Sequence, residues 1–359
     1  MSKKVLSFGE LLLRICPDAG GEWLQENALS VYVGGAEANV ATALALWGVP
    51  SAYFTALPEN LMGQQLAGYL QQRKIDTSRI VYQGQRLGLY FLPKGKDLKN
   101  AGVIYDRDRS SFSDLQPGQT DWDKVLQDVG WLHFSAISPA LNRRVATVCE
   151  EALQAASARK ITISVDLNYR AKLWQYGMQP VEIMPDLAKY CDVIMGNLWA
   201  AEKMLGVPVD TAAIESGKKE DYLRHALASS KKITELFPKA RFVANTFRFD
   251  LGAGEGTGQG GSQATGEGTG QGPAGIHYYT TLFADRQLYH SREYFAEKIA
   301  DKVGSGDCYM AGLIYGLFRQ RPVQETLEFA TAAAFQKLFI TSDATNQKAE
   351  EIDRFIQTL

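Results

Sequence analysis

The chain has 359 residues, 45% of them hydrophobic and 22% charged, which suits one large α/β domain or two ordinary ones. Its 38 basic and 40 acidic residues give a net charge of −2, so no basic field favours nucleic acid or an anionic membrane as a partner. The apolar run near Met1 is too short for a signal peptide, and no run of about 18 apolar residues predicts a membrane span. We therefore expect a cytoplasmic protein.

The cysteines and histidines do not suggest a metal centre. Both sets are scattered along the chain without metal-ligand spacing. We expect the cysteines to be reduced and mostly to serve as packing residues, and we expect no zinc site. The residues concerned are Cys16, Cys149, Cys191, Cys308, His133, His225, His277 and His290.

The first part of the chain predicts short strands and two helices. Strands are expected at residues 5–8, 11–15, 30–33 and 52–56, and helices at 40–47 and 63–73. Gly34 and Gly35, just before the first helix, let the backbone pass close to a ligand, and Asn39 can hydrogen-bond a hydroxyl. A glycine turn before a helix with an exposed Asn39 explains the same pattern, and this segment alone leaves both interpretations open.

The next segment predicts a hairpin. Residues 87–92 and 101–106 are rich in β-forming residues and are joined by a polar, glycine-containing link. With the earlier strands, they can form a small sheet separate from the main one. We expect such a sheet, built from about 11–33 and 86–108, to act as a lid over a site.

From residue 120 the pattern is a regular alternation of strands and helices. Strands are expected at 131–135, 161–167, 192–196 and 241–246, and helices at 143–156, 181–189 and 200–205. This order predicts a parallel sheet covered by helices, with ligands bound beyond the carboxyl ends of its strands. Polar residues recur at those ends, which favours a site over ordinary loop composition. They are Ser135, Asp166, Asn168, Arg170, Asn197 and Thr246.

Residues 252–275 form a glycine-rich, low-complexity insertion in which one seven-residue motif occurs twice. Nothing in it can build a core, so we expect it to be flexible. It is not a phosphate loop, because no lysine follows it and no helix opens from it. Strand character resumes as a hairpin at 278–283 and 287–289, and two helices close the chain at 323–339 and 348–357.

The stretch from Asp301 to Gly316 carries the strongest chemical signal. Gly304, Ser305 and Gly306 predict a tight turn that opens a buried helix, with Asp307 in its first turn. The unpaired N–H groups of such a turn form an anion hole. Asp307 would then be placed to accept a proton from an alcohol, although the helix N-terminus should make it a weaker base. An ordinary helix start with Asp307 as N-cap is the alternative.

With these motifs in this order, the chain resembles the ribokinase-like (PfkB) family of sugar kinases. The early Gly34-Gly35-x-x-x-Asn39 segment and the late Gly304-Ser305-Gly306-Asp307 segment look like that family's two signature regions. The resemblance covers the chain except the glycine-rich insertion. It is finest with the 2-keto-3-deoxygluconate kinases, through segments 33–40, 87–90, 105–107, 137–141 and 166–170.

The resemblance implies a single ribokinase-like domain over residues 1–359, a three-layer α/β/α sandwich with a mainly parallel central sheet and a small β lid. It also implies ATP, Mg²⁺ and transfer of the γ-phosphoryl group to the primary hydroxyl of 2-keto-3-deoxygluconate, giving the 6-phosphate. The catalytic residues it implies are Asp307 as base and Gly304, Ser305 and Gly306 as anion hole. The sugar contacts are Gly34, Gly35, Asn39, Tyr90, Tyr105, Arg107, Ile137, Asn168 and Arg170. The nucleotide contacts are Asn197, Thr246, Arg248, Gly304 and Gly306.

The chain departs from the family pattern near the metal and nucleotide. Where the family often has Asn-x-x-Glu, Asn197 is followed at the glutamate position by Ala200. Glu202 is then the candidate metal contact through water, unless the metal relies on phosphate oxygens. The loop from Thr246 leads into the insertion instead of a compact glycine turn. Asp301 matches a position sometimes linked to a monovalent cation, but the adjacent Lys302 argues against one.

Three functions remain open from the sequence. They are a keto-deoxy sugar acid kinase, a kinase for a neutral sugar such as fructose, and a non-catalytic sugar-binding protein. Arg107 and Arg170 favour the first, because guanidinium groups suit a carboxylate, unless they are surface residues paired with acids such as Asp106 or Asp108. The retained Asp307 argues against the third. The resemblance also suggests a homo-oligomer formed through the lid.

Overall fold

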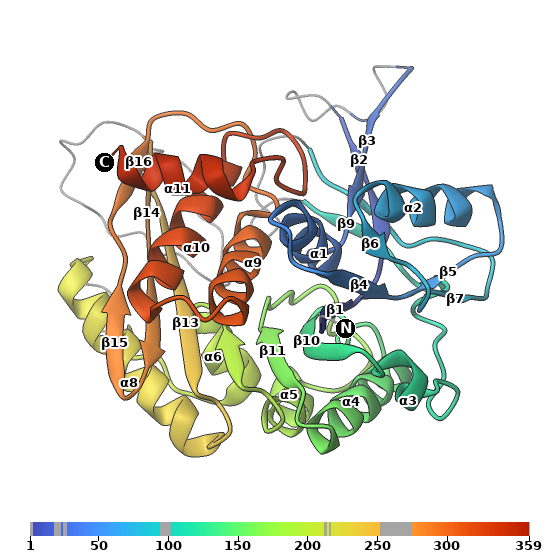
Figure 1. Cartoon of the computed structure of the whole chain (residues 1–359), viewed down its shortest axis with the longest axis horizontal. Helices are drawn as coiled ribbons and strands as arrows, with labels where there is room; N and C mark the ends of the chain where they lie inside the picture. The colour runs from blue at the N-terminus through green and yellow to red at the C-terminus, as the bar shows by residue number, and fades with distance from the viewer. Residues whose placement is uncertain are drawn as a thin grey trace.

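The computed structural model describes residues 3–17, 23, 27–93, 102–211, 214, 217–251 and 275–358 (Figure 1). The predicted insertion therefore lies outside the described residues except for Gly275, and so does most of the predicted link between residues 92 and 101.

The main sheet is mainly parallel, as predicted. Its strands lie in the order β15-β14-β13-β12-β11-β10-β1-β4-β6, and β16 pairs with β14. Neighbours from β13 to β6 run parallel, whereas β14 pairs antiparallel with β13, β15 and β16. The strands are β1 (Lys4–Phe8), β4 (Ser51–Phe54), β6 (Ile75–Asp76), β10 (Val129–Ser135), β11 (Thr162–Asp166), β12 (Val193–Met195), β13 (Phe242–Leu251), β14 (Gly275–Ala284), β15 (Gln287–His290) and β16 (Tyr294–Ala296).

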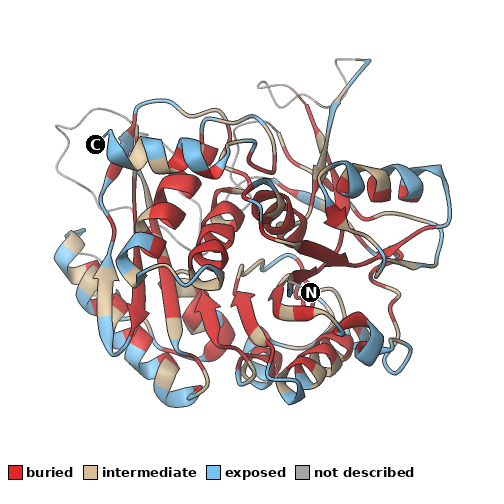
Figure 2. Ribbon diagram, viewed as in Figure 1, coloured by how far each residue is buried: buried red, intermediate tan, exposed pale blue. Residues whose placement is uncertain are grey.

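Helices cover both faces of this sheet, which confirms the three-layer α/β/α sandwich (Figure 1). Alternation along β1 sends Leu6 and Phe8 into one core and Val5 into the other. The first face packs against α3 (Trp122–Val125), α4 (Arg143–Ala158), α5 (Pro180–Ala188), α6 (Leu198–Leu205) and α8 (Lys219–Leu236). The second packs against α1 (Ala36–Leu46), α9 (Ser305–Phe318), α10 (Val323–Lys337) and α11 (Ala349–Gln357). Figure 2 shows α9 buried along most of its length.

A separate small sheet is also confirmed. It contains β2 (Leu12–Cys16), β3 (Ser30–Gly34), β8 (Leu89–Phe91) and β9 (Ile104–Asp106), in the order β3-β2-β8-β9. The register aligns Arg14 with Tyr90 and Tyr105 on one side of this sheet. Three further elements lie in the sequence between β4 and β8: β5 (Ala56–Leu57), α2 (Leu61–Gln72) and β7 (Val81–Tyr82). Strands β5 and β7 pair with each other.

Three local predictions were wrong or incomplete. Helix α1 begins at Ala36 rather than residue 40, because Gly35 takes the N-cap position with a φ of 127°, so Asn39 lies inside the helix. Strand β13 runs to Leu251 instead of ending at Thr246, because β14 continues to pair with it. Helix α8 was missed because most of its buried positions are small, polar or ionisable rather than aliphatic, so the helical period is weak.

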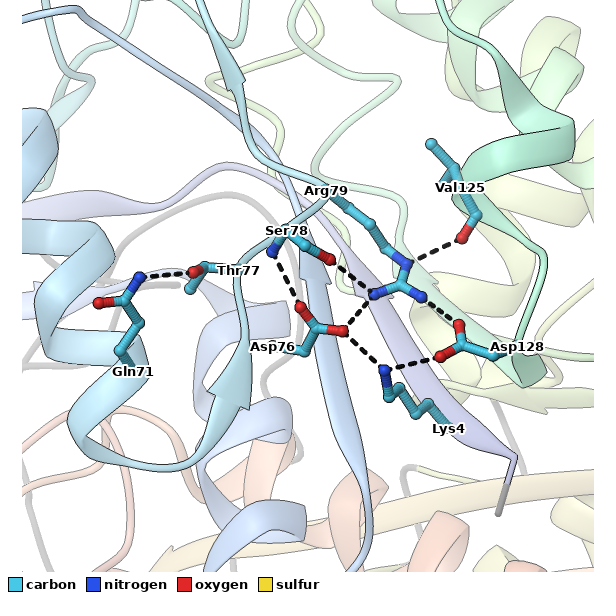
Figure 3. A network of polar contacts seen from close by, with 8 residues as sticks. All are labelled: Lys4, Gln71, Asp76, Thr77, Ser78, Arg79, Val125 and Asp128. Carbon is cyan, nitrogen blue, oxygen red and sulfur yellow. Dashed lines mark hydrogen bonds and ion pairs between the residues drawn. The ribbon is translucent and has the colours of Figure 1, made fainter. Parts of the chain in front are cut away.

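A polar network joins the start of β1, the residue before β10 and the last residue of β6 (Figure 3). The Lys4 ammonium lies 2.7 Å from an Asp76 oxygen and 2.6 Å from an Asp128 oxygen. Arg79 pairs with the same two aspartates and donates through Nε to the Val125 carbonyl at 2.9 Å. Burial alone would raise the pKa of Asp76, but hydrogen bonds from Lys4, Ser78 and Arg79 lower it.

Two expectations from composition can be set beside the structure. The four cysteines are all buried and none forms a disulfide, as expected for packing residues. Within the described ranges, no helix combines the length and apolar character needed to cross a membrane.

Candidate active site

A cavity of about 380 Å³ lies along the carboxyl ends of β1, β10, β11, β12 and β13. The predicted gathering of polar residues at this edge is largely confirmed, although Ser135 is not among the residues that line the cavity. The side facing β1 is called the β1 end below, and the side facing β13 the β13 end. Predicted site residues that line the cavity are Gly35, Asn39, Tyr90, Tyr105, Arg107, Ile137, Asn168, Arg170, Asn197, Thr246, Arg248, Gly304, Ser305, Gly306 and Asp307.

The turn before α9 has the predicted form. Gly304 is the N-cap, with a left-handed φ of 78°, and α9 starts at Ser305. A Cβ on Gly304 would lie only 1.8 Å from the Asp343 carbonyl oxygen, so backbone strain and packing both require glycine there. The nearest neighbour of a Cβ on Gly306 would be Met195 Cε at 3.9 Å, so a small side chain fits beside the protein there, in contrast to Gly304.

The first-turn backbone N–H groups of α9 therefore border the cavity and can receive an anion. The Ser305 hydroxyl does not take part, because it donates to the Ala334 carbonyl at 3.0 Å. The alternative in which Asp307 is the N-cap is wrong, since Gly304 holds that position and no side chain caps the helix.

Asp307 is a buried carboxylate that accepts a hydrogen bond from Asn39 Nδ2 at 2.7 Å. Burial raises the pKa of Asp307 to about 7, against the lowering effect of the Asn39 hydrogen bond; Asp166 adds to the rise and Arg170 opposes it. The expectation of a weaker base is therefore wrong for the free protein, because burial outweighs the helix N-terminus. A carboxylate with this pKa at a cavity is suited to general-base chemistry near neutral pH.

At the β1 end, Arg107 is buried and ion-paired. Its Nε lies 2.5 Å from Glu10 Oε2, and the Ser110 hydroxyl donates to the other oxygen of Glu10. Pairing of Arg107 with Asp106 or Asp108 is excluded, because Arg107 pairs with Glu10 and Asp106 pairs with Arg86.

A second buried acid, Glu37, also lines this end. Its Oε1 accepts hydrogen bonds from the Ser135 N–H at 2.9 Å and the Ser135 hydroxyl at 2.6 Å. Burial raises the pKa of Glu37 to about 7. A Cβ on Gly9 would lie 2.1 Å from Glu37 Oε2, so glycine there makes room for the carboxyl group. Sequence reasoning missed Glu10 and Glu37; the available signal was an acid directly after a buried strand and another inside the Gly34–Asn39 motif.

Arg170 reaches the cavity from the loop after β11. Asn168 turns that loop with a positive φ of 25° and donates its N–H to Asp166 Oδ1 at 3.0 Å. Arg170 Nη1 donates to the Tyr169 carbonyl at 3.3 Å. Within the described part of the chain no acidic group forms an ion pair with Arg170, so its charge is less neutralised locally than that of Arg107.

Gly34, one of the predicted sugar contacts, lies behind the cavity wall. A Cβ there would meet Asp343 Oδ2 at 2.9 Å and the Tyr90 ring at 3.1 Å. Tyr90 lines the cavity and donates its hydroxyl to Asp343 Oδ2 at 2.5 Å. Gly34 thus permits close packing between the small sheet and the Asp343 segment.

At the β13 end the predicted residues lie on two elements. Asn197 caps α6 by accepting the Ala200 N–H at 2.7 Å, and Thr246 and Arg248 lie on β13. Sequence reasoning did not assign Lys203, which lines this end, or Lys302, which also does so and pairs with Asp250 at 2.9 Å.

Glu202, the candidate metal contact, does not line the cavity. Its Oε1 accepts the Val209 N–H at 3.5 Å and its Oε2 lies 3.5 Å from Lys203 Nζ. In the residues that the structure describes, no group of three or more His, Cys, Asp or Glu side chains could hold a metal ion. The protein groups therefore do not form a metal cage of their own.

A glycine-containing helix start, a buried carboxylate beside it and a cavity along the edge of a parallel sheet fit an enzyme that transfers a phosphoryl group to an alcohol. The comparison with known families agrees. The chain belongs to the pfkB family of carbohydrate kinases, which it matches over residues 2–230 and 270–349. It is thus a carbohydrate kinase with the ribokinase-like fold.

Three individual kinases show which members of the family this chain resembles. The crystal structure of 2-dehydro-3-deoxygluconokinase from Thermotoga maritima superposes with a TM-score of 0.83 at 32% identity, covering 99% of both chains. A 2-dehydro-3-deoxygalactonokinase from Haloferax volcanii is 23% identical over 99% of this chain and 98% of its own. A 5-dehydro-2-deoxygluconokinase from Geobacillus thermodenitrificans is 25% identical over 91% of this chain and 84% of its own.

Proposed function

We propose that this kinase transfers the γ-phosphoryl group of ATP to the primary hydroxyl of 2-keto-3-deoxygluconate, giving the 6-phosphate. The observation that carries the sugar-acid assignment is Arg170, a guanidinium that lines the cavity and has no ion-pair partner among the described residues. A carboxylate is the natural partner for such a group. The names of the three relatives given above, kinases of keto-deoxy sugars or sugar acids, support the same class.

In this proposal Asp307 accepts the proton of the attacking hydroxyl, and Asn39 holds the carboxylate in place. The sugar O6 forms a bond to the γ-phosphorus as the bond from that phosphorus to the bridging oxygen breaks, and ADP leaves. The N–H groups of residues 304–306 hold the transferring group where its charge develops. Burial of Asp307 keeps its pKa close to neutral, so the proton is accepted without a large penalty.

The two arginines receive different roles. Arg107 is already neutralised by Glu10, so we assign it to shaping the pocket and bonding sugar hydroxyls. Arg170 binds the substrate carboxylate. The remaining proposed sugar contacts are Gly35, Asn39, Tyr90, Tyr105, Ile137 and Asn168, with Gly34 acting through packing.

For the nucleotide we propose the β13 end, with Asn197, Thr246 and Arg248 joined by the unassigned Lys203 and Lys302. ATP normally carries Mg²⁺, which offsets the charge of its phosphates. Since the described residues offer no cluster of metal ligands, the ion would be held mostly by phosphate oxygens and water, as Mg²⁺ commonly is. Glu202 would have to rotate toward the cavity to take part.

The test is an ADP-release assay over sugar acids and neutral sugars, including 2-keto-3-deoxygluconate and fructose, with Arg170→Ala and Arg107→Ala as a matched pair. A hydrogen bond to a charged group contributes about 1.5–3 kcal/mol, so Arg170→Ala should lower kcat/KM for the acid by roughly 10–150-fold. Its effect on fructose should be much smaller. Arg107→Ala should impair both substrates alike, because it leaves Glu10 buried without its partner.

A wild-type preference for fructose would replace this proposal with a fructokinase, which the neutralised Arg107–Glu10 pair would also serve. Equal losses on both substrates in Arg170→Ala would likewise defeat the sugar-acid assignment. Absence of ADP release with every sugar would leave only a sugar-binding protein, the role suggested by Ala200 at the usual glutamate position.

We also propose that the small sheet acts as the lid and pairs with that of a second copy. One row on its outer side, Val31, Ile15, Phe91 and Ile104, is entirely apolar, and Val31 and Ile104 are 56% and 55% exposed. Exposed apolar rows on edge strands favour association. Sedimentation of the wild type against Ile104→Lys measures this: a monomeric wild type would contradict it.

A further inference from the structure

A buried charged cluster joins the small sheet to the turn that opens α9. It contains Arg14 from β2, Tyr90 from β8, Asp301, Lys337 from α10, and Asp343. The side chains of Arg14 and Asp301 are fully buried, and that of Asp343 is 1% exposed. Apart from Tyr90, these residues are not among those that line the cavity, and the proposed chemistry uses none of their charges.

Arg14 binds two aspartates at once. Its Nη2 lies 2.7 Å from Asp301 Oδ2, and its Nε lies 3.0 Å from Asp343 Oδ1. Tyr90 donates its hydroxyl to the other oxygen of Asp343. Strand β2 is thus held by both acids and its neighbour β8 by Asp343, and both acids belong to the main body of the protein.

The two aspartates in turn contact the phosphate-binding turn. Asp301 Oδ1 accepts the Val303 N–H at 3.1 Å, one residue before Gly304. The Asp343 carbonyl oxygen packs against the Cα of Gly304, where a Cβ would lie within 1.8 Å. The position of Gly304 therefore depends on where Asp301 and Asp343 lie, and Arg14 links these two residues.

Few other charges can take the place of Arg14. Lys337 is fully buried beside Gly304, but its ammonium donates to the Ile340 carbonyl at 3.0 Å and forms no ion pair with the two aspartates. Burial lowers the pKa of Lys337, whereas the pKa of Arg14 is raised despite its burial, because the charges of Asp343 and Asp301 favour the guanidinium. Removing Arg14 would leave two buried carboxylates without a direct ionic partner.

We propose that Arg14 is a positioning residue that couples the small sheet, and hence the sugar it covers, to the turn that holds the phosphoryl group. Sugar that binds against Tyr90 and Tyr105 restricts the position of the small sheet. Arg14 then restricts the positions of Asp301 and Asp343. These two residues in turn restrict the position of Gly304 and of the N–H groups after it. This rests on the proposed kinase function. It predicts that the sugar and the nucleotide bind cooperatively and that this cooperativity depends on Arg14.

The test measures binding, which does not require turnover. The Kd of the non-hydrolysable nucleotide adenosine 5′-(β,γ-imido)triphosphate is measured by calorimetry with and without 2-keto-3-deoxygluconate, in the wild type, Arg14→Lys and Arg14→Met. The sugar should tighten nucleotide binding at least about fivefold in the wild type. The ratio should fall below twofold in Arg14→Met. It should lie between the two in Arg14→Lys, since a lysine keeps the charge but lacks the planar guanidinium whose Nη2 and Nε face Asp301 and Asp343.

Arg79→Met is the matched control. Arg79 also bridges two aspartates, Asp76 and Asp128 (Figure 3), but none of these three residues lines the cavity. It should lower the melting temperature and leave the ratio unchanged. For the Arg14 variants, circular dichroism establishes folding; if Arg14→Met does not fold, Arg14→Lys is judged by whether its ratio falls at least twofold.

The outcomes separate this inference from the proposed function. A folded Arg14 variant with the wild-type ratio, an equal loss of the ratio in Arg79→Met, or a wild-type ratio of one would each overturn the coupling. A wild type that binds both ligands cooperatively but releases no ADP would instead overturn the kinase proposal and leave the coupling standing. If the sugar panel favours fructose, the same titrations are made with fructose as the probe.

Discussion

The two ends of the cavity are built in different ways. At the β1 end the charged side chains are buried and already hydrogen-bonded: Glu37 to Ser135, Arg107 to Glu10 and Asp307 to Asn39. At the β13 end the two lysines differ, because the side chain of Lys203 is 56% exposed whereas that of Lys302 is 19% exposed and pairs with Asp250. The first end is preorganised, whereas at the second Lys203 would acquire its order from the ligand.

This difference suits two kinds of ligand. Sugars differ from one another mainly in the positions of similar hydroxyl groups. Selectivity therefore needs hydrogen-bond partners whose side-chain entropy has already been lost during folding. A triphosphate brings several charges of its own, and an exposed side chain such as Lys203 can adapt to it. Changes at the β1 end and the α9 turn should therefore alter chemistry or sugar choice, and changes at the β13 end should mainly alter nucleotide affinity.

The largest expected effect is at Asp307. Asp307→Asn keeps the size of the side chain and removes the base, so kcat should fall by about 10²–10⁴-fold while the sugar Kd changes little. Steady-state kinetics and calorimetric sugar binding measure the two quantities. Asn197→Ala, at the β13 end, is the companion variant and should act mainly on the KM for ATP. Near-normal turnover of Asp307→Asn would show that another group accepts the proton.

Gly304 and Gly306 offer a sharper contrast within one turn. Gly304→Ala places a Cβ against the Asp343 carbonyl and strains a left-handed residue, so its melting temperature should fall clearly. Gly306→Ala would bring its Cβ only into ordinary contact with Met195 Cε at 3.9 Å, so the fold should be retained. The methyl group should displace the phosphoryl group and lower kcat by about 10²-fold. Thermal melts and kinetics on both variants check this. A stable, fully active Gly306→Ala variant would show that the phosphoryl group does not bind at this turn.

The sequence made parts of this contrast predictable. The turn at Gly304–Asp307 is local, and its glycine pattern together with the apolar run after it was enough to place a helix start. The hydrogen bond from Asn39 to Asp307 joins residues 268 positions apart and follows only from the packing of α1 against α9. The same limit applies to the arginines: local sequence gives Arg107 and Arg170 equal standing, and only the tertiary partner Glu10 separates them.

A further prediction concerns pH. Because the pKa of Asp307 is raised to about 7, its base form is lost as the pH falls, and kcat/KM should drop about tenfold per pH unit below 7 and level off above it. Asn39→Leu removes the hydrogen bond that lowers this pKa, so the acid side of the kcat/KM profile should move to higher pH. The pKa of Glu37 is also about 7, and Glu37→Gln is the control. If kcat/KM no longer fell below pH 7 in Glu37→Gln, the titrating group would be Glu37 rather than Asp307.

The smallest effect is expected from the glycine-rich insertion at the β13 end. Leu251 pairs with Gly275 at the last position of the β13–β14 ladder, so a short Gly/Ser link can join the two strands in place of residues 252–274. Loop-closure cost changes slowly with length, and shortening to about four residues should be neutral or stabilise by roughly 1.5 kcal/mol. The melting temperature and the KM values for both substrates measure the result. A large fall in melting temperature would show that the insertion packs against the protein. A rise in the KM for ATP alone would show that the insertion is part of the nucleotide site and contributes binding groups beyond those of the described residues at the β13 end.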